Sequence, residues 1–247
     1  MGNDRAVGII PARLAATRLP DKPLLLIGGK TMIERVWERA RRARSLAEVA
    51  VATPDEAIAR VVERFGGRAI MTAHAHRSGT DRVAEAAGSM EADIVVNIQG
   101  DEPLLEAETI DRAVEPLIED PSIAMSSLMC PCPPEEIDRP STVKVVADLA
   151  GNALYFSRST IPFLRDPLGG ARVRQHIGLY AYRRERLLEL SALAPTPLER
   201  TEGLEQMRAL EHGLRIRMVE VASAPLSVDT PEDLERARLL LTEDCRG

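Results

Sequence analysis

The chain has few cysteines, few aromatic residues and no excess of positive charge. Its three cysteines, Cys130, Cys132 and Cys245, are too few and too unevenly spaced for a disulfide framework or a zinc site, so we expect reduced thiols without a functional role. Aromatic residues make up only 3% of the sequence, which leaves no row of rings for stacking single-stranded bases. A net charge of −6 also argues against a basic nucleic-acid-binding face. We therefore expect no nucleic-acid partner.

Long apolar runs are also absent from the sequence. No stretch approaches the roughly 20 apolar residues that cross a membrane. The first apolar run, Val7–Ile10, is too short for the core of a signal peptide and meets Pro11 at once. Position 6 is Ala, where a myristoylation motif after Gly2 needs Ser or Thr. We expect a cytoplasmic protein that does not bind a membrane.

Short β-branched runs alternate with amphipathic helical patterns through the first half of the chain. The predicted strands are residues 7–10, 49–52, 69–71 and 94–98, and the predicted helices are residues 32–42, 56–65, 79–87 and 107–119. Capping signals support the helix starts: Thr31 with Glu34, then Asp55, then Thr230 with Asp233. This alternation predicts an α/β fold with a mostly parallel sheet flanked by helices.

The pattern changes after Pro121, where closely spaced strands are predicted at residues 123–128, 143–146, 153–156, 177–182 and 216–221. The middle strands are too close for helical crossovers, so we expect a smaller antiparallel insertion at residues 130–190 that offers a dimer surface. No repeat or polar linker divides the chain, which predicts a single domain over residues 1–247.

The loop after the first strand, PARLAATRLPDKPL at residues 11–24, carries Arg13, Arg18 and Lys22. Open α/β sheets bind ligands at the carboxyl ends of their strands. Guanidinium groups fork onto phosphate oxygens and an ammonium acts as a point charge, so the loop suits a polyphosphate. The alternative is a set of solvated surface cations. GGKT at residues 28–31 is not a P-loop, because Leu24 stands where that motif needs Gly, and no GxGxxG follows the first strand.

Acidic residues follow a later strand, in VNIQGDEP at residues 96–103. Asp101 there, and the distant Asp229 in SVDTPEDL, both stand just after a predicted strand. Magnesium takes one or two protein carboxylates together with substrate phosphates, so the pair predicts a Mg²⁺ site if both strands end on the same edge. Either residue could instead be a helix cap.

Two further stretches suggest ligand contacts. In HRSGTDR at residues 76–82, Ser78 stands at the start of a helix, where free backbone N–H groups can bind a ligand or Ser78 can act only as a cap. QHIGLYAYRR alternates as a strand, so His176 and Tyr180 share one face, although a lone His is more often structural.

Seven stretches in order resemble those of the 3-deoxy-manno-octulosonate (Kdo) cytidylyltransferases, also called CMP-Kdo synthetases. They are PARLAATRLPDKPL, HRSGTDR, VNIQGDEP, VKVV at residues 143–146, ALYFSRSTIP at 153–162, QHIGLYAYR and VDTPEDLERAR. The resemblance covers about Val7 to Arg238. It implies a Rossmann-like nucleotidyltransferase fold, a homodimer, magnesium, and transfer of CMP from CTP to Kdo with release of pyrophosphate. The product would serve lipopolysaccharide or capsule synthesis.

The resemblance also implies residue roles. Arg13, Arg18 and Lys22 would hold the triphosphate, Asp101 and Asp229 the magnesium, and Ser78 would lie in the cytosine-reading segment; Arg18, Lys22, Asp101 and Asp229 would be catalytic. Gln99 would help to place nucleotide and sugar. The sugar pocket would be lined by Arg158, His176, Tyr180, Glu205 and Gln206.

Two departures from the family pattern leave alternatives open. Asp21 replaces the Gly that many relatives carry before the lysine, and residues 164–174 follow no family pattern, so the sugar accepted could differ. The alternatives are activation of another acidic sugar, such as 8-amino-Kdo or a sialic acid, or a non-catalytic module that binds CTP as a regulatory ligand.

Overall fold

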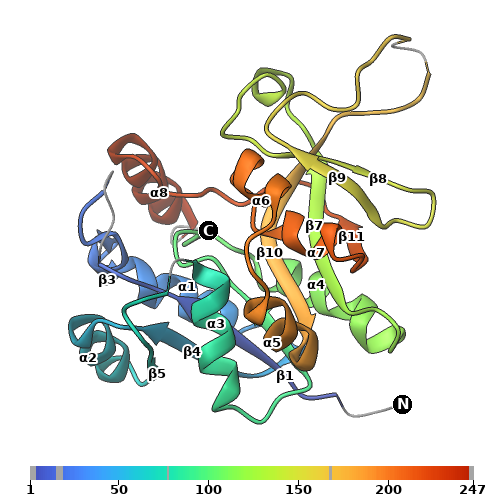
Figure 1. The fold of residues 1–247 in the computed structure, drawn as a ribbon. Helices are drawn as coiled ribbons and strands as arrows, with labels where there is room; N and C mark the ends of the chain where they lie inside the picture. The colour runs from blue at the N-terminus through green and yellow to red at the C-terminus, as the bar shows by residue number, and fades with distance from the viewer. Residues whose placement is uncertain (1–3, 15–18, 77, 167–168, 245–247) are drawn as a thin grey trace. The chain divides into compact units, whose positions relative to one another are not determined.

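The computed structural model describes residues 4–14, 19–76, 78–166 and 169–244, with the side chains of residues 242–244 left aside (Figure 1). The chain forms two compact units, Met1–Asp111 with Pro225–Gly247, and Arg112–Ala224. The single domain over residues 1–247 and its insertion at residues 130–190 therefore stay predictions. The two units are described in turn.

A parallel sheet forms the centre of the first unit. Its strands are β1 (Ala6–Pro11), β4 (Leu46–Thr53), β5 (Arg68–Met71) and β6 (Ile94–Asn97), in the order β6-β1-β4-β5. β1 pairs in parallel with β4 on one side and with β6 on the other. β1, β4 and β6 each carry a run of buried apolar residues, as expected for strands that are covered on both faces, whereas no residue of β5 is fully buried.

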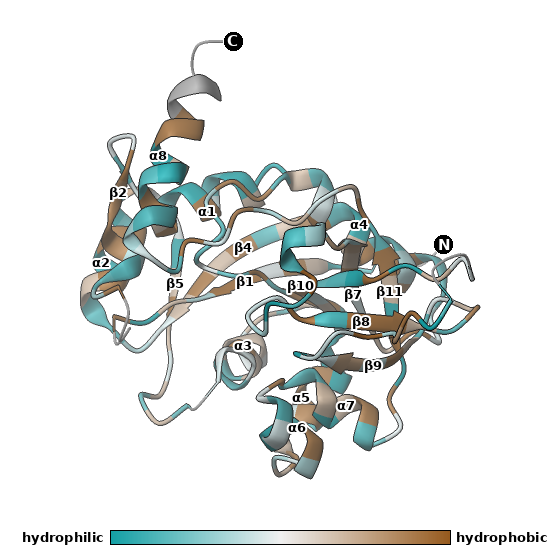
Figure 2. Ribbon diagram, turned by 90° about the horizontal axis from the view of Figure 1, so that it is seen from above, coloured by the Kyte–Doolittle hydropathy of each residue, from teal (hydrophilic) through white to brown (hydrophobic). Residues whose placement is uncertain are grey.

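Helices connect these strands as the sequence predicts. They are α1 (Met32–Ala40), α2 (Glu56–Arg64) and α3 (Gly79–Gly88), and α4 (Ala107–Glu119) begins at the end of this unit. Figure 2 shows α1 and α3 on opposite sides of β1 and β4. Thr31 caps α1, and its hydroxyl accepts a hydrogen bond from the backbone N–H of Glu34. Asp55 stands at the N-cap position of α2, as predicted, but its side chain makes no hydrogen bond to the helix.

The chain end returns to the first unit as α8 (Pro231–Asp244). α8 packs on the short hairpin of β2 (Leu26–Ile27) and β3 (Lys30–Thr31), which follows the 3-10 helix η1 (Lys22–Leu24). The apolar side chains of this cluster include Ile27, Met32, Val228 and Leu234. Burial of this cluster holds the segment before α8 against the loop region that follows β1.

The second unit carries the antiparallel part of the fold. Its strands are β7 (Met125–Pro131), β8 (Lys144–Ala147), β9 (Ala153–Ser157), β10 (Arg174–Arg183) and β11 (Ile216–Glu220). β10 is antiparallel to β7 and β8, β8 is antiparallel to β9, and β11 is parallel to β7. The short helices are η2 (Pro134–Glu136), α5 (Arg184–Ala192), α6 (Pro197–Glu202) and α7 (Gln206–Glu211). The mixed α/β class with a mostly parallel sheet and an antiparallel part is confirmed.

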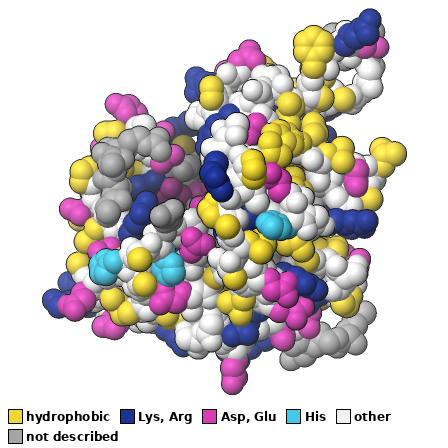
Figure 3. Space-filling model, viewed as in Figure 1, with side chains coloured by type: hydrophobic (Ala, Val, Ile, Leu, Met, Phe, Trp, Pro, Cys, Tyr) yellow, Lys and Arg dark blue, Asp and Glu magenta, His cyan; other side chains and the backbone are white. Residues whose placement is uncertain are grey.

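The described surface carries charge of both signs. On the face shown in Figure 3, Lys and Arg side chains are interspersed with Asp and Glu. Among the described residues, no helix combines the length and the apolar character that crossing a bilayer requires.

Candidate active site

A pocket of about 420 Å³ opens in the first unit, beside the loops that follow β1, β5 and β6. These loops leave the carboxyl ends of parallel strands, where open α/β sheets bind their ligands. Of the predicted site residues, the pocket is lined by Arg13, Lys22, Ser78, Gln99, Asp101 and Asp229. Arg18 lies outside the described residues.

The loop after β1 is held by two hydrogen bonds that its backbone N–H groups donate. The N–H of Ala12 donates to the carbonyl of Ala52 at 2.9 Å, and the N–H of Leu14 donates to the carboxylate Oδ2 of Asp55 at 2.9 Å. Arg13 stands between them with an exposed side chain that lines the pocket. Its guanidinium makes no hydrogen bond to any residue that the structure describes.

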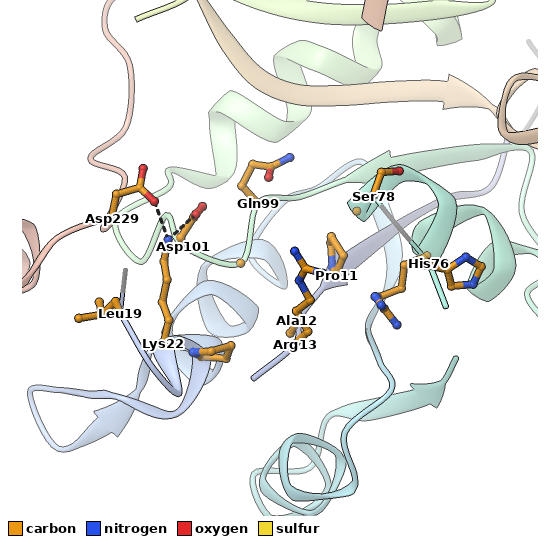
Figure 4. A pocket seen from close by; sticks show the side chains of 14 residues that line it. Pro11, Ala12, Arg13, Leu19, Lys22, His76, Ser78, Gln99, Asp101 and Asp229 are labelled. Carbon is orange, nitrogen blue, oxygen red and sulfur yellow. Dashed lines mark hydrogen bonds and ion pairs between the residues drawn. The ribbon is translucent and has the colours of Figure 1, made fainter. Parts of the chain in front are cut away.

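Lys22 reaches the two predicted carboxylates from the first turn of η1. Its Nζ lies 2.7 Å from Oδ2 of Asp101 and 3.0 Å from Oδ1 of Asp229, and its side chain is 15% exposed (Figure 4). The residue before it, Asp21, has a φ of +54°. This left-handed conformation favours Gly and is tolerated by Asp. The turn therefore keeps its shape with Asp in that place.

Backbone contacts explain why Asp101 and Asp229 meet although they are far apart in sequence. The N–H of Val228 donates to the carbonyl of Asp101 at 2.9 Å, and Val228 is fully buried. Asp229 is not the cap of α8. Thr230 is the cap, and the carboxylate of Asp233 accepts hydrogen bonds from the N–H groups of Asp229 and Thr230 at 3.1 and 2.9 Å. The N–H of Asp233 in turn donates to the hydroxyl of Thr230 at 3.2 Å, and this reciprocal cap fixes the backbone from which the Asp229 carboxylate projects.

The same two carboxylates fit a divalent cation. They already converge on one positive group, the ammonium of Lys22, so a cation that replaced it would face two anionic oxygens. Two carboxylates completed by phosphate oxygens and water are typical of magnesium sites. No cluster of three or more His, Cys, Asp or Glu side chains suited to a metal occurs among the described residues, and a magnesium site of this kind needs fewer.

Glu102, beside Asp101, has a different environment. It is 7% exposed, and its Oε2 has no hydrogen-bond partner in the described part of the chain. Burial raises the pKa of Glu102 to about 8, and the charge of Asp101 adds to this shift. Asp101 therefore supplies the charge at this strand end.

The start of α3 forms another wall of the pocket. The hydroxyl of Ser78 accepts a hydrogen bond from the N–H of Asp81 at 3.0 Å, so Ser78 caps the helix and also lines the pocket. Figure 4 shows Ser78 across the pocket from Lys22, with Gln99 between them. The two interpretations of Ser78 are therefore compatible.

The predicted sugar-pocket residues all belong to the second unit. His176 is 8% exposed, its Nε2 lies 2.9 Å from the hydroxyl of Ser127, and its ring contacts Phe156 and Tyr180. Burial lowers the pKa of His176 to about 3, so the imidazole is neutral near pH 7. Gln206 is buried and Glu205 is exposed.

Arg158 is exposed but is bound to its own scaffold. Its guanidinium donates to the carbonyls of Pro140 at 2.9 Å, Glu202 at 2.8 Å and Gly203 at 3.4 Å. Its backbone N–H donates to the Glu202 carboxylate at 3.0 Å. These contacts hold the end of β9 against the turn after α6.

Comparison with known proteins identifies the family. A sequence model described as cytidylyltransferase matches residues 7–216. The 3-deoxy-manno-octulosonate cytidylyltransferase of Myxococcus xanthus is 51% identical over 242 residues, which cover 98% of each chain. That of Pelobacter propionicus is 50% identical over 93% of this chain and 94% of the relative. The chain belongs to the 3-deoxy-manno-octulosonate cytidylyltransferase family. A solved CMP:2-keto-3-deoxy-manno-octonic acid synthetase, complexed with CTP, is 44% identical, with a TM-score of 0.94 over 97% of this chain and 99% of that one.

Membership of the 3-deoxy-manno-octulosonate cytidylyltransferase family confirms the resemblance inferred from the motifs, whereas the roles of individual residues stay predictions.

Sequence reasoning missed two pocket residues, His76 and Arg82. Arg82 is 3% exposed and donates to the hydroxyl of Thr72 at 2.6 Å and to the carbonyl of Ala73 at 3.2 Å. His76 pairs with Glu85. A signal for both residues was present in the sequence, because HRSGTDR carries several basic residues and follows a parallel strand.

Proposed function

We propose that this chain transfers CMP from CTP to the anomeric hydroxyl of Kdo and releases pyrophosphate. The observation that carries the proposal is the convergence of Asp101 and Asp229 on Lys22 in a pocket that Arg13 also lines. A triphosphate brings several negative charges, and this pocket offers both positive groups and a carboxylate pair for a cation. The product would supply lipopolysaccharide or capsule synthesis.

In the proposed complex the basic loop binds the triphosphate. The Arg13 guanidinium can fork onto phosphate oxygens, and Lys22 supplies a point charge. Arg18 completes this set in the proposal. Cations on the β- and γ-phosphates stabilise the charge that builds up as pyrophosphate leaves.

Asp101 and Asp229 would hold the proposed Mg²⁺. When bound there, the ion neutralises phosphate charge and makes a coordinated hydroxyl easier to deprotonate. Lys22 then has to exchange partners, because its Nζ is within bonding distance of both carboxylates. A triphosphate beside it offers the replacement anion, so Lys22 turns from the carboxylates to the phosphates.

The reaction is an in-line displacement. The anomeric oxygen of the sugar forms a bond to the α-phosphorus, the bond from that phosphorus to the β-bridging oxygen breaks, and pyrophosphate leaves with the electron pair. The hydroxyl proton passes to solvent. No covalent intermediate on the protein is required, so positioning and charge stabilisation supply the catalysis.

The remaining residues are assigned to recognition. Ser78 with its neighbouring backbone would read cytosine, and Gln99 would place nucleotide and sugar. The residues assigned to the sugar are Arg158, His176, Tyr180, Glu205 and Gln206. Because the imidazole of His176 is neutral and buried, we assign it a hydrogen-bonding role, not the task of neutralising the sugar carboxylate.

We also propose a single functional domain, a homodimer and a cytoplasmic location. Exposed apolar side chains in the second unit, Leu149, Leu154 and Phe163, support a protein contact at the insertion. Cys130 and Cys132 are free thiols, as expected in a reducing compartment. Sedimentation at several concentrations tests the dimer.

The decisive assay incubates the chain with CTP, Mg²⁺ and Kdo. We expect a CMP-sugar detected by mass spectrometry and one pyrophosphate per product. Parallel reactions with 8-amino-Kdo and a sialic acid test the sugar, and ATP, GTP and UTP test the base. CTP binding without pyrophosphate release from any of these sugars would contradict the proposal and favour a regulatory module.

A further inference from the structure

Asp55 occupies the N-cap position of α2, yet its carboxylate does not cap the helix. It makes no side-chain hydrogen bond to the first turn. Instead, Oδ2 accepts a hydrogen bond from the backbone N–H of Leu14 at 2.9 Å. Asp is among the residues that cap helices best. A favourable local contact is therefore replaced by one with a loop 41 residues away in sequence.

The partner of Asp55 adjoins a pocket residue. Arg13 lies between Ala12, whose N–H donates to Ala52 at the end of β4, and Leu14, whose N–H donates to Asp55. The two bonds fix the backbone on both sides of Arg13. Without the bond from Leu14 to Asp55, the loop beyond Arg13 would lose its attachment to the turn between β4 and α2. The guanidinium of Arg13 would then sample more positions.

Asp55 also places a negative charge near the guanidinium of Arg82. Burial is the main cause that lowers the pKa of Arg82, the charge of Arg13 lowers it further, and the charge of Asp55 raises it. The carboxylate thus offsets part of the repulsion between Arg13 and Arg82, both of which line the pocket. Its position favours keeping both cations on the same wall.

We propose that Asp55 is a positioning residue for the nucleotide: it holds the loop after β1 so that Arg13 faces the triphosphate. The inference rests on the proposed function, because it takes CTP as the occupant of the pocket. Asp55 itself lies behind the loop backbone and acts through Leu14 and Arg13.

Three substitutions of Asp55 separate this role from a role in helix stability. Asp55→Ser places a good capping residue before α2, but its hydroxyl is one bond shorter than the carboxylate and cannot replace the bond to Leu14. Asp55→Asn keeps an acceptor oxygen at the same reach and removes the charge. Asp55→Ala removes both. Glu56→Gln is the matched control, since Glu56 is the exposed neighbour in the first turn.

The measurements are the Kd for CTP with Mg²⁺ by calorimetry, the steady-state constants and the thermal midpoint. We expect the Ser and Ala variants to bind CTP about tenfold more weakly, as for loss of one positioning hydrogen bond. The Asn variant should lose less than about threefold. KM for CTP should rise more than kcat falls, and KM for the sugar should stay constant. The Ser variant should melt no lower than the Ala variant.

Two results would overturn the inference while the proposed function stands. One is a Ser variant that binds CTP as tightly as the wild type. The other is a loss of affinity that follows the thermal midpoint in every variant, with Asn no better than Ala. A wild-type chain that binds no CTP would instead remove the proposed function, and with it this inference.

Discussion

Arg13 and Arg158 both come from stretches that predict ligand binding, yet their surroundings differ. Arg13 projects into a pocket and makes no hydrogen bond to a described residue, whereas Arg158 donates to the carbonyls of Pro140, Glu202 and Gly203. Arg13 therefore contributes a guanidinium to the wall of a pocket, while Arg158 holds the loops of its own unit. The residue type alone does not distinguish these uses.

The largest effect is expected for Asp101, one of the two carboxylates that line the pocket. Asp101→Asn should retain the fold and lower turnover at least ~100-fold, the scale of removing one electrostatic stabiliser of a transition state. Pyrophosphate release from CTP and Kdo measures the loss. Glu106→Gln, which changes an exposed carboxylate in the same loop, is the control and should have normal turnover. Near-normal turnover of Asp101→Asn would remove Asp101 from the site.

The second prediction concerns the closed environment of His176. Its pKa is about 3 in the folded chain and about 6.5 when unfolded. Below pH 6.5 the unfolded chain takes up a proton that the folded chain does not, so stability is full above this pH and falls by about 1.4 kcal/mol per pH unit toward pH 3. Urea unfolding of wild type and His176→Gln between pH 6.5 and 4.5 measures the difference. If the free energy of unfolding changed with pH in the same way in the wild type and in His176→Gln, the buried, neutral state of His176 would be contradicted.

The third prediction compares the two arginines directly. Arg158→Ala should lower the free energy of unfolding by about 1–2 kcal/mol, because its bonds to loop carbonyls are lost. Arg13→Ala should change it by less than about 0.5 kcal/mol, since the side chain is exposed and has no described hydrogen-bond partner to lose, and should weaken CTP binding instead. Urea unfolding and calorimetry give both values. Equal losses of stability would erase the distinction between the two regions.

The smallest expected effect concerns Lys22 as the resident partner of the carboxylates. Lys22→Met should raise the affinity for Mn²⁺ about threefold to tenfold in the absence of nucleotide, because Asp101 and Asp229 lose a competing cation. Electron paramagnetic resonance of free Mn²⁺ measures this without turnover. Lys30→Met, at a surface pair with Glu38, is the control. Unchanged Mn²⁺ affinity would show that Lys22 does not compete.

The sequence predicted the strands other than β2 and β3, and the starts of α1 to α4 and α8, because their signals are local; the helices α5 to α7 were not predicted. Buried runs such as Val49–Ala52 and the Thr31 cap are visible within a few residues. Asp55 satisfies the local rule for a cap, but its carboxylate accepts a hydrogen bond from the backbone N–H of Leu14, in a distant loop. The meeting of Asp101 and Asp229 could be expected only conditionally, because it depends on the backbone bond from Val228 to Asp101.

Two further features depend on tertiary packing. Arg82 falls on the buried face of α3, at a position in the helical pattern where a core residue is expected. Its approach to the pocket depends on where α3 meets the loop after β1. The partners of Arg158 come from loops near residues 140 and 202, which tertiary packing alone brings together. Contacts between side chains and loops that are distant in sequence are therefore the part of the structure that the sequence could not supply, while the role of Arg158 in sugar binding stays a prediction.

The lysines of this chain can be distinguished by chemical modification. There are three, and they occupy three different environments: Lys30 has a 39% exposed side chain, Lys22 a 15% exposed one in the pocket, and Lys144 is fully buried with Nζ donating to the carbonyls of Arg139, Thr142 and Arg158. An acylating reagent read out by peptide mass spectrometry would therefore modify Lys30 freely and Lys144 only after local opening. Lys22 would be shielded by whatever fills the pocket, so one chemical modification would report surface, occupancy and unfolding together.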